Sequence, residues 1–252
     1  MVSAVITVIA STPFETELLR RHLSPCEVRR CGRRDLYRGT MFGQSVALLH
    51  AGVGKANAAA ATLALLESWQ PLVVVALGCG GAYPGSGLEV GDLALATEEL
   101  YGDEGSLTPA GFRDLECLGL PLLQVNQRRY YNRYPVDAKL LEKSRPLLQQ
   151  TMDGMERRMA AGTFVTVSCC SGTDAAGKEM AERTSGLCEN MEGAAVAQIC
   201  AQYGVPFLEL RGISNLVEDR DPARWDLKSG ALVAQLAFKG LLSGWNERRE
   251  SA

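Results

Sequence analysis

The chain has 252 residues, with 26 lysine and arginine side chains against 29 aspartate and glutamate side chains, giving a formal net charge of −3. This balance argues against a protein built to coat nucleic acid, which would carry a basic surface. Charged residues at 22% and hydrophobic residues at 46% are ordinary for a globular protein, so a mainly disordered chain is excluded.

Strands and helices alternate along the chain. The first half predicts, in order, strand Val5–Ile9, helix Glu15–Leu23, strands Cys26–Arg30, Leu36–Met41 and Val46–His50, helix Ala56–Ser68, strand Leu72–Leu77, glycine-rich loop Gly78–Gly87 and strand Asp92–Thr97. The second half predicts a surface excursion at Gly111–Tyr134, helix Ala138–Gln150, strand Thr163–Ser168, helices Ala175–Thr184 and Met191–Tyr203, strand Phe207–Ile213 and helix Trp225–Trp245. This alternation indicates one α/β domain over residues 1–252, with a mainly parallel sheet covered by helices on both faces.

Targeting segments and metal centres are not expected from this sequence. No apolar run reaches the roughly 20 residues of a membrane helix, and the apolar start MVSAVITVIASTPFE lacks the basic region of a signal peptide. The eight cysteines form no CxxC pair and only two histidines accompany them, which leaves little material for a zinc site. We therefore expect a reduced, cytoplasmic protein without membrane contact or bound metal.

Glycine motifs give no support for a nucleotide cofactor. Gly52–Lys55 fails as a phosphate loop, because Leu49 and Ala56 stand where glycine and serine or threonine are needed. Gly78–Tyr83 lacks the last glycine of a dinucleotide fingerprint. No cofactor is therefore expected.

In open α/β sheets, ligands bind beyond the carboxyl ends of the strands. Four segments follow predicted strands, and Glu192 opens a predicted helix; the segments are Ser11–Glu15, Gly78–Gly87, Ser168–Asp174 and Arg211–Asp221. The functional residues are expected among these positions.

Each candidate also has a purely structural explanation. Thr12–Glu15 is a capping box, which places a glutamate at the third helical position for structural reasons. Glu192 favours a helix dipole, and Asn215 suits a turn after a strand. Similarly, His22 and His50 are interpreted as a solvated and a structural side chain. The combination, and no single residue, supports a functional interpretation.

Taken together, these segments resemble the purine nucleoside phosphorylase and nucleosidase superfamily. The resemblance rests on the first strand with Glu15, on Ala51–Ala59, on Gly80–Gly81 followed by Val90–Asp92, and on Met191–Ala195 with Arg211–Ser214. It implies the nucleoside phosphorylase/hydrolase-like fold, a three-layer single domain whose central sheet is mixed but mostly parallel. Gly80–Leu88, Tyr101–Gly105 and Ile213–Asn215 are most similar to the futalosine hydrolases, relatives of the methylthioadenosine/S-adenosylhomocysteine nucleosidases.

The resemblance implies roles for individual residues. Glu15 matches the glutamate that positions and deprotonates water, and Glu192 matches the carboxylate that accepts hydrogen bonds from the ribose hydroxyls. Met191 corresponds to a residue that packs on the sugar, and Arg211 to an arginine that steadies Glu192. The remaining substrate-binding positions are Cys79 and Gly80 behind the ribose and base, and Ser171, Gly172 and Thr173 in the base-side loop Ser168–Thr173.

Asn215 stands where the adenosine-cleaving nucleosidases of this family carry aspartate. A 6-oxopurine presents two acceptors, O6 and N7, which an amide NH₂ can serve. Asn215 therefore predicts a hypoxanthine leaving group. An amide cannot protonate N7, so a water, Asp219 or Asp221 supplies the proton, or hydrogen bonds alone stabilise the leaving base.

The resemblance implies hydrolysis of futalosine to dehypoxanthine futalosine and hypoxanthine, a step of menaquinone biosynthesis. The alternatives are a methylthioadenosine/S-adenosylhomocysteine-type nucleosidase, a purine nucleoside phosphorylase, and a non-catalytic purine sensor on the same fold. Hydrolysis is favoured because Ser11–Glu15 contains no glycine-plus-arginine anion loop, and the Glu15 carboxylate would repel phosphate.

The expected partner is a small-molecule purine nucleoside, and no nucleic acid. The resemblance also implies a homo-oligomer, a dimer or higher. Arg128, Arg129 and Tyr130 either meet the carboxylate of the futalosine tail or form a solvated loop.

Overall fold

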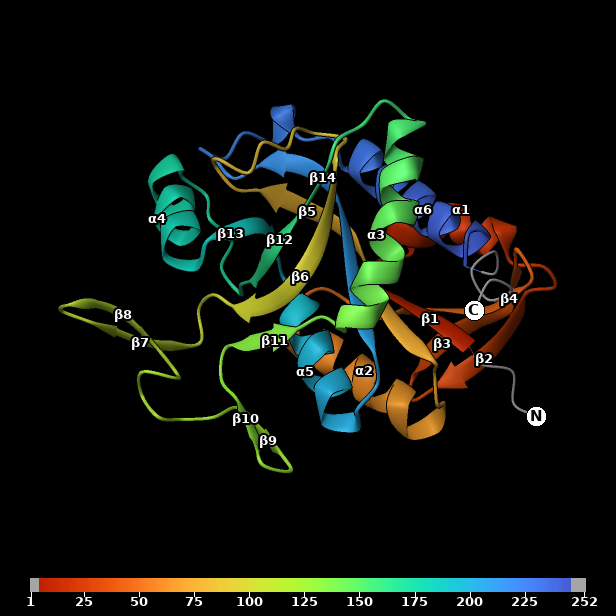
Figure 1. The fold of residues 1–252 in the computed structure, drawn as a ribbon, viewed down its shortest axis with the longest axis horizontal. Helices are drawn as coiled ribbons and strands as arrows, with labels where there is room; N and C mark the ends of the chain where they lie inside the picture. Colours follow the sequence, from red (N-terminus) through yellow and green to blue (C-terminus); the bar gives the residue numbers. More distant parts are fainter. Residues whose placement is uncertain (1–4, 246–252) are drawn as a thin grey trace.

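The structure is a computed structural model that describes residues 5–245 (Figure 1). Its strands are β1 (Val5–Ala10), β2 (Glu27–Cys31), β3 (Arg34–Met41), β4 (Gln44–His50), β5 (Val73–Ala82), β6 (Leu93–Tyr101), β7 (Gly105–Thr108), β8 (Gly111–Asp114), β9 (Leu123–Val125), β10 (Arg128–Tyr130), β11 (Arg133–Pro135), β12 (Met159–Thr166), β13 (Gly186–Asn190) and β14 (Phe207–Leu216). Its helices are the 3₁₀ turns η1 (Pro13–Thr16) and η2 (Pro222–Arg224), and α1 (Glu17–His22), α2 (Lys55–Ser68), α3 (Ala138–Asp153), α4 (Asp174–Thr184), α5 (Gly193–Tyr203) and α6 (Leu227–Ser243).

A 10-stranded sheet forms the centre of the fold, in the order β11-β6-β12-β13-β5-β1-β4-β3-β2, with β14 paired to both β5 and β6. Parallel pairs join β1 to β4 and β5, β14 to β5, and β12 to β6 and β13. The remaining pairs within this sheet are antiparallel. Because β1, β5 and β14 run in parallel, their carboxyl ends lie at one edge, where α/β proteins bind ligands.

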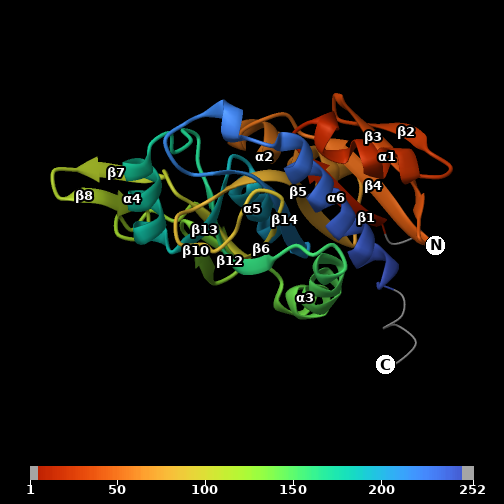
Figure 2. The same ribbon diagram turned by 90° about the horizontal axis from the view of Figure 1, so that it is seen from above.

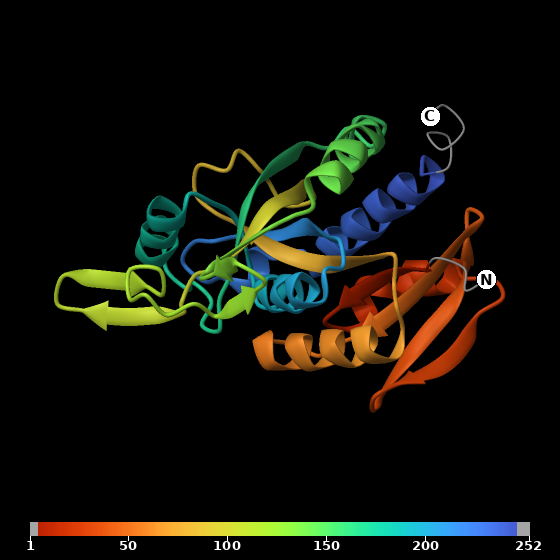
Figure 3. The same ribbon diagram turned by 60° about the horizontal axis from the view of Figure 1, so that its bottom comes forward.

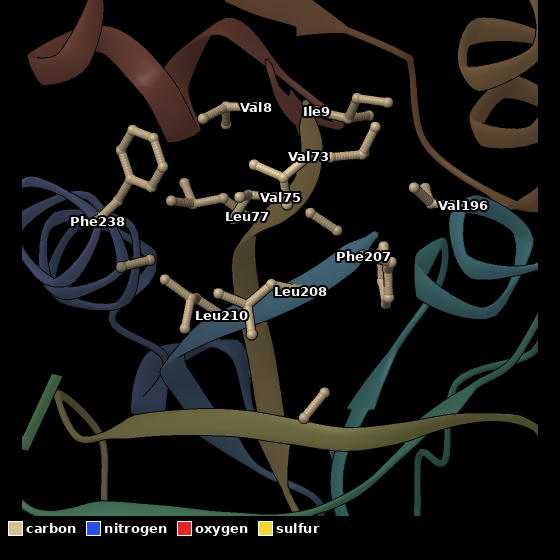
Figure 4. Packing of buried hydrophobic residues seen from close by; sticks show 14 of the residues in the cluster. Val8, Ile9, Val73, Val75, Leu77, Val196, Phe207, Leu208, Leu210 and Phe238 are labelled. Atoms are coloured by element: carbon tan, nitrogen blue, oxygen red, sulfur yellow. The ribbon is translucent and has the colours of Figure 1, made fainter. Parts of the chain in front are cut away.

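Helices cover both faces of this sheet. Figure 3 shows α2 and α5 on one side and α3 and α6 on the other, and Figure 2 places α1 beside α6. The apolar runs of β1 and β5 are buried on both faces, as their β-branched composition predicts. In the core, Phe238 of α6 lies on one side of Leu77 and Val196 of α5 on the other (Figure 4). The predicted three-layer α/β domain with a central mixed sheet is confirmed for residues 5–245; the remaining ends of the predicted 1–252 domain lie outside the described residues.

Two strand boundaries and one additional strand differ from the sequence-based prediction in ways that shape the site. The predicted loop Gly78–Gly87 begins as strand, because β5 continues to Ala82 while paired with β14. Strand β13 was not predicted, and it pairs with β5 and β12. Strand β14 extends to Leu216, so Asn215 lies within a strand and the turn interpretation is wrong.

The predicted excursion Gly111–Tyr134 consists largely of short strands. Strands β7 and β8 form one hairpin and β9 and β10 another, while β11 joins the edge of the main sheet. Within residues 5–245, no helix combines the length and the hydropathy that a membrane crossing needs.

Candidate active site

A pocket with a volume of about 280 Å³ opens at the carboxyl ends of β1 and β5. Residues from all the predicted segments line it, including Glu15, Glu192 and Asn215. The other predicted residues in its wall are Cys79, Gly80, Ser171, Met191 and Arg211. The fold thus brings together eight of the ten predicted site residues.

Gly172 and Thr173 do not line this pocket. The Thr173 hydroxyl caps α4 by accepting a hydrogen bond from the Ala176 N–H at 3.1 Å. The Gly172 carbonyl accepts a hydrogen bond from the Arg220 N–H at 3.2 Å. These two residues of the loop Ser168–Thr173 therefore make structural contacts outside the pocket wall.

Glu15 is held at the pocket wall by three hydrogen bonds. Its Oε2 accepts from the Thr12 backbone N–H at 2.9 Å and from the Thr12 hydroxyl at 3.1 Å, which completes the predicted capping box. Its Oε1 accepts from the Cys79 N–H of β5 at 3.0 Å. Only 7% of the residue is exposed. Glu15 is therefore both a helix-capping residue and a fixed carboxylate in the pocket.

Position 78 has room only for glycine, because the Glu15 carboxylate lies against it. A Cβ at Gly78 would collide with Glu15 Oε1 and would approach Arg211 Nη1 to 2.9 Å. A side chain there would displace the carboxylate, so glycine in this strand makes room for Glu15.

Glu192 occupies the N-cap of α5 and is 6% exposed. Its Oε1 accepts a hydrogen bond from the Gly54 N–H at 2.8 Å, and its Oε2 lies 3.4 Å from Arg211 Nη2. Gly54 precedes α2 with φ of +93°, a conformation that favours glycine. The predicted Gly52–Lys55 turn thus serves to anchor a carboxylate.

Arg211 organises the floor of the pocket. Its Nε donates to Glu209 Oε1 at 2.7 Å, and its Nη1 donates to the Cys79 carbonyl at 3.0 Å. Burial alone would lower the pKa of this guanidinium, but Glu209, Glu192 and Glu15 raise the pKa above its ordinary value. The side chain is therefore a permanent cation between carboxylates.

The Asn215 amide is oriented by its neighbours in β14. Its Oδ1 accepts a hydrogen bond from the Ser214 hydroxyl at 2.9 Å, and its Nδ2 donates to the Leu216 carbonyl at 3.1 Å. An amide NH₂ carries two donors, so one N–H stays available to a ligand.

Sequence reasoning missed Glu189, a buried carboxylate in the pocket wall. Its Oε1 accepts from the Ser171 N–H at 3.0 Å, and its Oε2 accepts from the hydroxyls of Ser171 at 2.6 Å and Tyr83 at 2.8 Å. A prediction of strand β13 could have identified Glu189, because the pairing of this strand places Glu189 in the pocket wall.

Phe14, Arg220 and Trp225 also line the pocket; Phe14 and Arg220 fall within the predicted segments but were not singled out, and Trp225 lies outside those segments. The Arg220 guanidinium carbon lies 4.2 Å from the centroid of the Trp225 ring. Arg220 is exposed, and the described residues provide no carboxylate within ion-pair distance of it. Together these side chains combine aromatic surface with a cation.

Several alternatives from the sequence lie away from the pocket. Asp219 accepts from the Asp174 N–H at 3.0 Å, and Asp221 caps η2, so neither lines the pocket that holds Asn215. Arg128 and Arg129 line a separate depression with Tyr130. Similarly, His22 and His50 do not line the pocket; His50 lies 2.7 Å from the Thr16 hydroxyl, and exposed His22 contacts the Leu18 carbonyl.

The Cys79 thiol is unsuited to nucleophilic chemistry. Burial, followed by the negative charge of Glu15, raises its pKa to about 12, so the thiol is neutral at physiological pH. Its Sγ lies 3.4 Å from the Leu227 carbonyl. Within residues 5–245, no three His, Cys, Asp or Glu side chains are grouped as metal ligands.

Comparison with known proteins agrees with this geometry. A model of the phosphorylase superfamily matches residues 5–242. The 5′-methylthioadenosine/S-adenosylhomocysteine nucleosidase of Halalkalibacterium halodurans is 32% identical over 217 residues, covering 84% of this chain and 85% of that protein. The futalosine hydrolase of Thermus thermophilus is 36% identical over 202 residues, covering 80% and 83%. The solved nucleosidase of Neisseria meningitidis, in complex with methylthio-immucillin-A, superposes with a TM-score of 0.81 at 25% identity, covering 95% of this chain and 99% of that chain.

Proposed function

The chain belongs to the phosphorylase superfamily and is an N-glycosyl hydrolase of the nucleosidase type, and we propose that it hydrolyses futalosine to dehypoxanthine futalosine and hypoxanthine. The carboxylates Glu15 and Glu192 in one pocket suit hydrolysis of an N-glycosidic bond. The biological setting we propose is menaquinone biosynthesis, in line with the futalosine hydrolase among its relatives.

The observation that carries the substrate assignment is the orientation of Asn215. Because its Oδ1 already accepts from Ser214, the amide presents a donor to the pocket. The 6-oxopurine edge consists of acceptors at O6 and N7, whereas adenine carries an amino donor at C6. A donor at this position therefore favours hypoxanthine as the leaving base.

We assign the attacking water to Glu15. Its carboxylate is held by Thr12 and Cys79, so it does not need to reorganise during the reaction. Glu15 takes one proton as the water oxygen bonds to C1′ and the bond from C1′ to the purine nitrogen breaks. Because Asp219 and Asp221 lie outside the pocket lining, we assign protonation of the leaving base to a water, while Asn215 stabilises the negative charge that develops on the base. The proton held by Glu15 then returns to that water, which restores the Glu15 carboxylate.

Glu192 stabilises the ribosyl group. The Gly54 N–H and Arg211 hold its carboxylate where it accepts hydrogen bonds from the ribose hydroxyls, while Met191 packs on the sugar. Its negative charge opposes the positive charge that develops on the sugar in the oxocarbenium-like transition state.

The tail of futalosine fits the aromatic side of the pocket. This tail ends in a carboxyphenyl group, which needs an apolar surface for the ring and a cation for the carboxylate. Trp225 and Leu227 provide the surface, and Arg220, stacked on Trp225, provides the cation. Arg128 and Arg129, the residues considered from the sequence, line a different depression.

A methylthioadenosine/S-adenosylhomocysteine nucleosidase is the second candidate. The relative from Halalkalibacterium halodurans, 32% identical over 84% of this chain, favours it. Such an enzyme would release adenine and would not need a cation for a tail carboxylate.

Base release from three nucleosides decides between these candidates. Purified protein is incubated with futalosine, inosine and methylthioadenosine, each with and without phosphate, and the released base is separated by chromatography. We expect hypoxanthine from futalosine at a rate independent of phosphate. Adenine from methylthioadenosine would establish the second candidate, a phosphate requirement would establish a phosphorylase, and binding without base release would establish a purine sensor.

Replacing Asn215 with aspartate is expected to change the base preference. The substitution Asn215→Asp removes the N–H that serves a 6-oxopurine and adds an acceptor for the adenine amino group. Each mismatched hydrogen bond costs about 1–3 kcal/mol, so the ratio of kcat/KM for inosine over adenosine should fall about 10- to 100-fold. Asn126→Asp, at an exposed position, is the matched control. An unchanged ratio would contradict the proposed role of Asn215.

Removing the Arg220 cation is expected to weaken binding of the tail alone. In Arg220→Gln, KM for futalosine should rise about 10- to 100-fold, because a hydrogen bond to a charged group contributes about 1.5–3 kcal/mol. Inosine lacks the tail and is the internal control, so its kcat/KM should stay unchanged. An equal loss of kcat/KM with both nucleosides would contradict the assignment of Arg220 to the tail carboxylate.

The homo-oligomer and the cytoplasmic location stay predictions. Sedimentation of the purified protein measures the first, and fractionation of the source cells measures the second.

A further inference from the structure

Two glutamates form a buried pair behind Arg211. Glu99 of β6 and Glu209 of β14 are both 0% exposed. A Cβ at Gly193 would collide with Glu99 Oε1 and with Glu209 Oε2, so these two oxygens face one another across the start of α5. Two ionised carboxylates cannot share so small a buried space, which indicates that one of them carries a proton.

The hydrogen bonds around the pair identify which glutamate is neutral. Glu209 Oε1 pairs with the Arg211 Nε at 2.7 Å, whereas buried Glu209 Oε2 has no donor among the described protein atoms. Glu99 accepts from the Thr166 hydroxyl at 2.7 Å and from Asn190 Nδ2 at 3.0 Å, both neutral groups. A proton on Glu99 directed at Glu209 Oε2 provides the missing donor. Burial and the neighbouring Glu209 carboxylate accordingly raise the pKa of Glu99 well above its ordinary value.

The Glu99–Glu209 pair is linked to both the side chain and the backbone of Glu192. On the Glu209 side, Arg211 extends Nη2 to Glu192 Oε2 at 3.4 Å. On the Glu99 side, Asn190 Oδ1 accepts from the Glu192 N–H at 2.9 Å and from the Gly193 N–H at 2.7 Å. Both the carboxylate and the main chain of Glu192 are thus tied to one buried unit.

We propose that Glu99 and Glu209 are positioning residues that share one proton, with neutral Glu99 donating to charged Glu209, and that this pair fixes Glu192 against the ribose through Arg211 and Asn190. The inference rests on the proposed role of Glu192 in hydrolysis and is independent of the base and of the tail. With one proton on the pair, the Arg211 cation balances Glu209 and leaves Glu192 correctly placed for the developing sugar cation.

Neutral substitutions at the two positions distinguish the roles. Glu99→Gln replaces a neutral acid by a neutral amide that still donates to Glu209 and loses only the hydrogen bond from Asn190 Nδ2, so kcat should stay within about fivefold of the unmutated enzyme. Glu209→Gln removes the charge that holds Arg211, so kcat should fall at least about 10-fold with a smaller change in KM. Glu98→Gln, one residue away on β6 and paired with exposed Arg133, is the matched control and should leave kcat unchanged.

The pH dependence of stability tests the shared proton without any substrate. In the unfolded chain Glu99 loses its proton near pH 4.3, whereas in the native state it keeps it to higher pH. The native state therefore binds more protons between these values, and its stability falls as pH rises. As the pH rises from about 5 to 8, the Tm of Glu99→Gln should therefore increase relative to the Tm of the unmutated protein.

The other ionisable groups around Glu99 do not produce this slope. Besides Glu209 and Arg211 on β14, the groups that interact with Glu99 electrostatically include Cys188 on β13 and Tyr101 on β6. Burial raises the pKa of both Cys188 and Tyr101, so they stay neutral over this range.

Infrared spectroscopy of the unmutated protein provides a measurement that needs no variant. A carbonyl band of a buried protonated carboxyl is expected at neutral pH, and its absence would overturn the shared proton. A larger kcat loss in Glu99→Gln than in Glu209→Gln, or a Tm difference independent of pH, would also overturn the inference. If the unmutated protein cleaves no nucleoside, the proposed function fails, while the infrared and Tm measurements still decide the state of the pair.

Discussion

The substitution Glu15→Gln is expected to lower kcat at least 100-fold while the protein stays folded. General-base assistance is worth about 10²–10⁴ in rate, and a glutamine amide cannot accept the proton of the attacking water. A 100-fold loss corresponds to about 2.7 kcal/mol of the barrier. The measurement is single-turnover base release from whichever nucleoside the unmutated protein cleaves, with Tm recorded in parallel.

Glu15 also caps a helix, so stability has to be separated from chemistry. Glutamine keeps one acceptor oxygen, which can serve the Thr12 N–H, but its NH₂ group cannot accept from the Cys79 N–H. The lost charge near a helix start costs about 0.3–1 kcal/mol more, so Tm is expected to fall. Glu17→Gln, an exposed carboxylate two residues on, is the matched control and should keep full activity. A lower Tm with unchanged kcat in Glu15→Gln would show that Glu15 is a capping residue alone.

Glu15 illustrates which of its contacts the sequence could predict and which it could not. The capping box was identified from Thr12 and Glu15 alone, because it depends on local backbone geometry. The hydrogen bond from the Cys79 N–H, which fixes Glu15 at the pocket, comes from β5, 64 positions away in the sequence. The sequence pattern predicts the local capping contact, whereas the contact with Cys79 exists only once the sheet has assembled.

The errors in the fold arose where pairing overrode local preference. Gly78–Gly81 was interpreted as a loop because glycine is depleted in strands, yet β14 and β13 supply the hydrogen bonds that keep this segment extended. The same pairing places Asn215 opposite Gly81 inside β14, so its amide orientation is set by the sheet. Pairing between strands that are far apart in the sequence leaves no periodic signal in the glycine-rich end of β5.

Three buried carboxylates at or behind the pocket could not be predicted from the sequence. A glutamate is almost always exposed, so Glu99, Glu189 and Glu209 carried no mark that distinguished them from surface residues. Their burial follows from partners brought together by the fold: Arg211 for Glu209, Ser171 and Tyr83 for Glu189. Glu15 and Glu192, which both line the pocket, could be proposed from the sequence because their surrounding motifs, and not their residue type, resembled a known family.

The substitution Glu192→Gln is expected to lower kcat about 100- to 1,000-fold, the range seen when one preorganised electrostatic contact to a transition state is removed. The carboxylate opposes positive charge that exists only in the transition state, so kcat should fall more than KM rises. The glutamine side chain of this variant keeps an acceptor oxygen for the Gly54 N–H, which preserves the local anchor.

A substrate lacking the 2′-hydroxyl separates the two tasks assigned to Glu192. If the carboxylate acts partly through the ribose hydroxyls, the loss caused by Glu192→Gln should be smaller with the 2′-deoxynucleoside than with the ribonucleoside, because the contact is already missing there. Electrostatic stabilisation of the sugar cation would persist with both substrates. Equal losses would confine Glu192 to the electrostatic task, whereas no loss with either substrate would contradict its placement at the ribose and, with it, the purpose of the Arg211 contact.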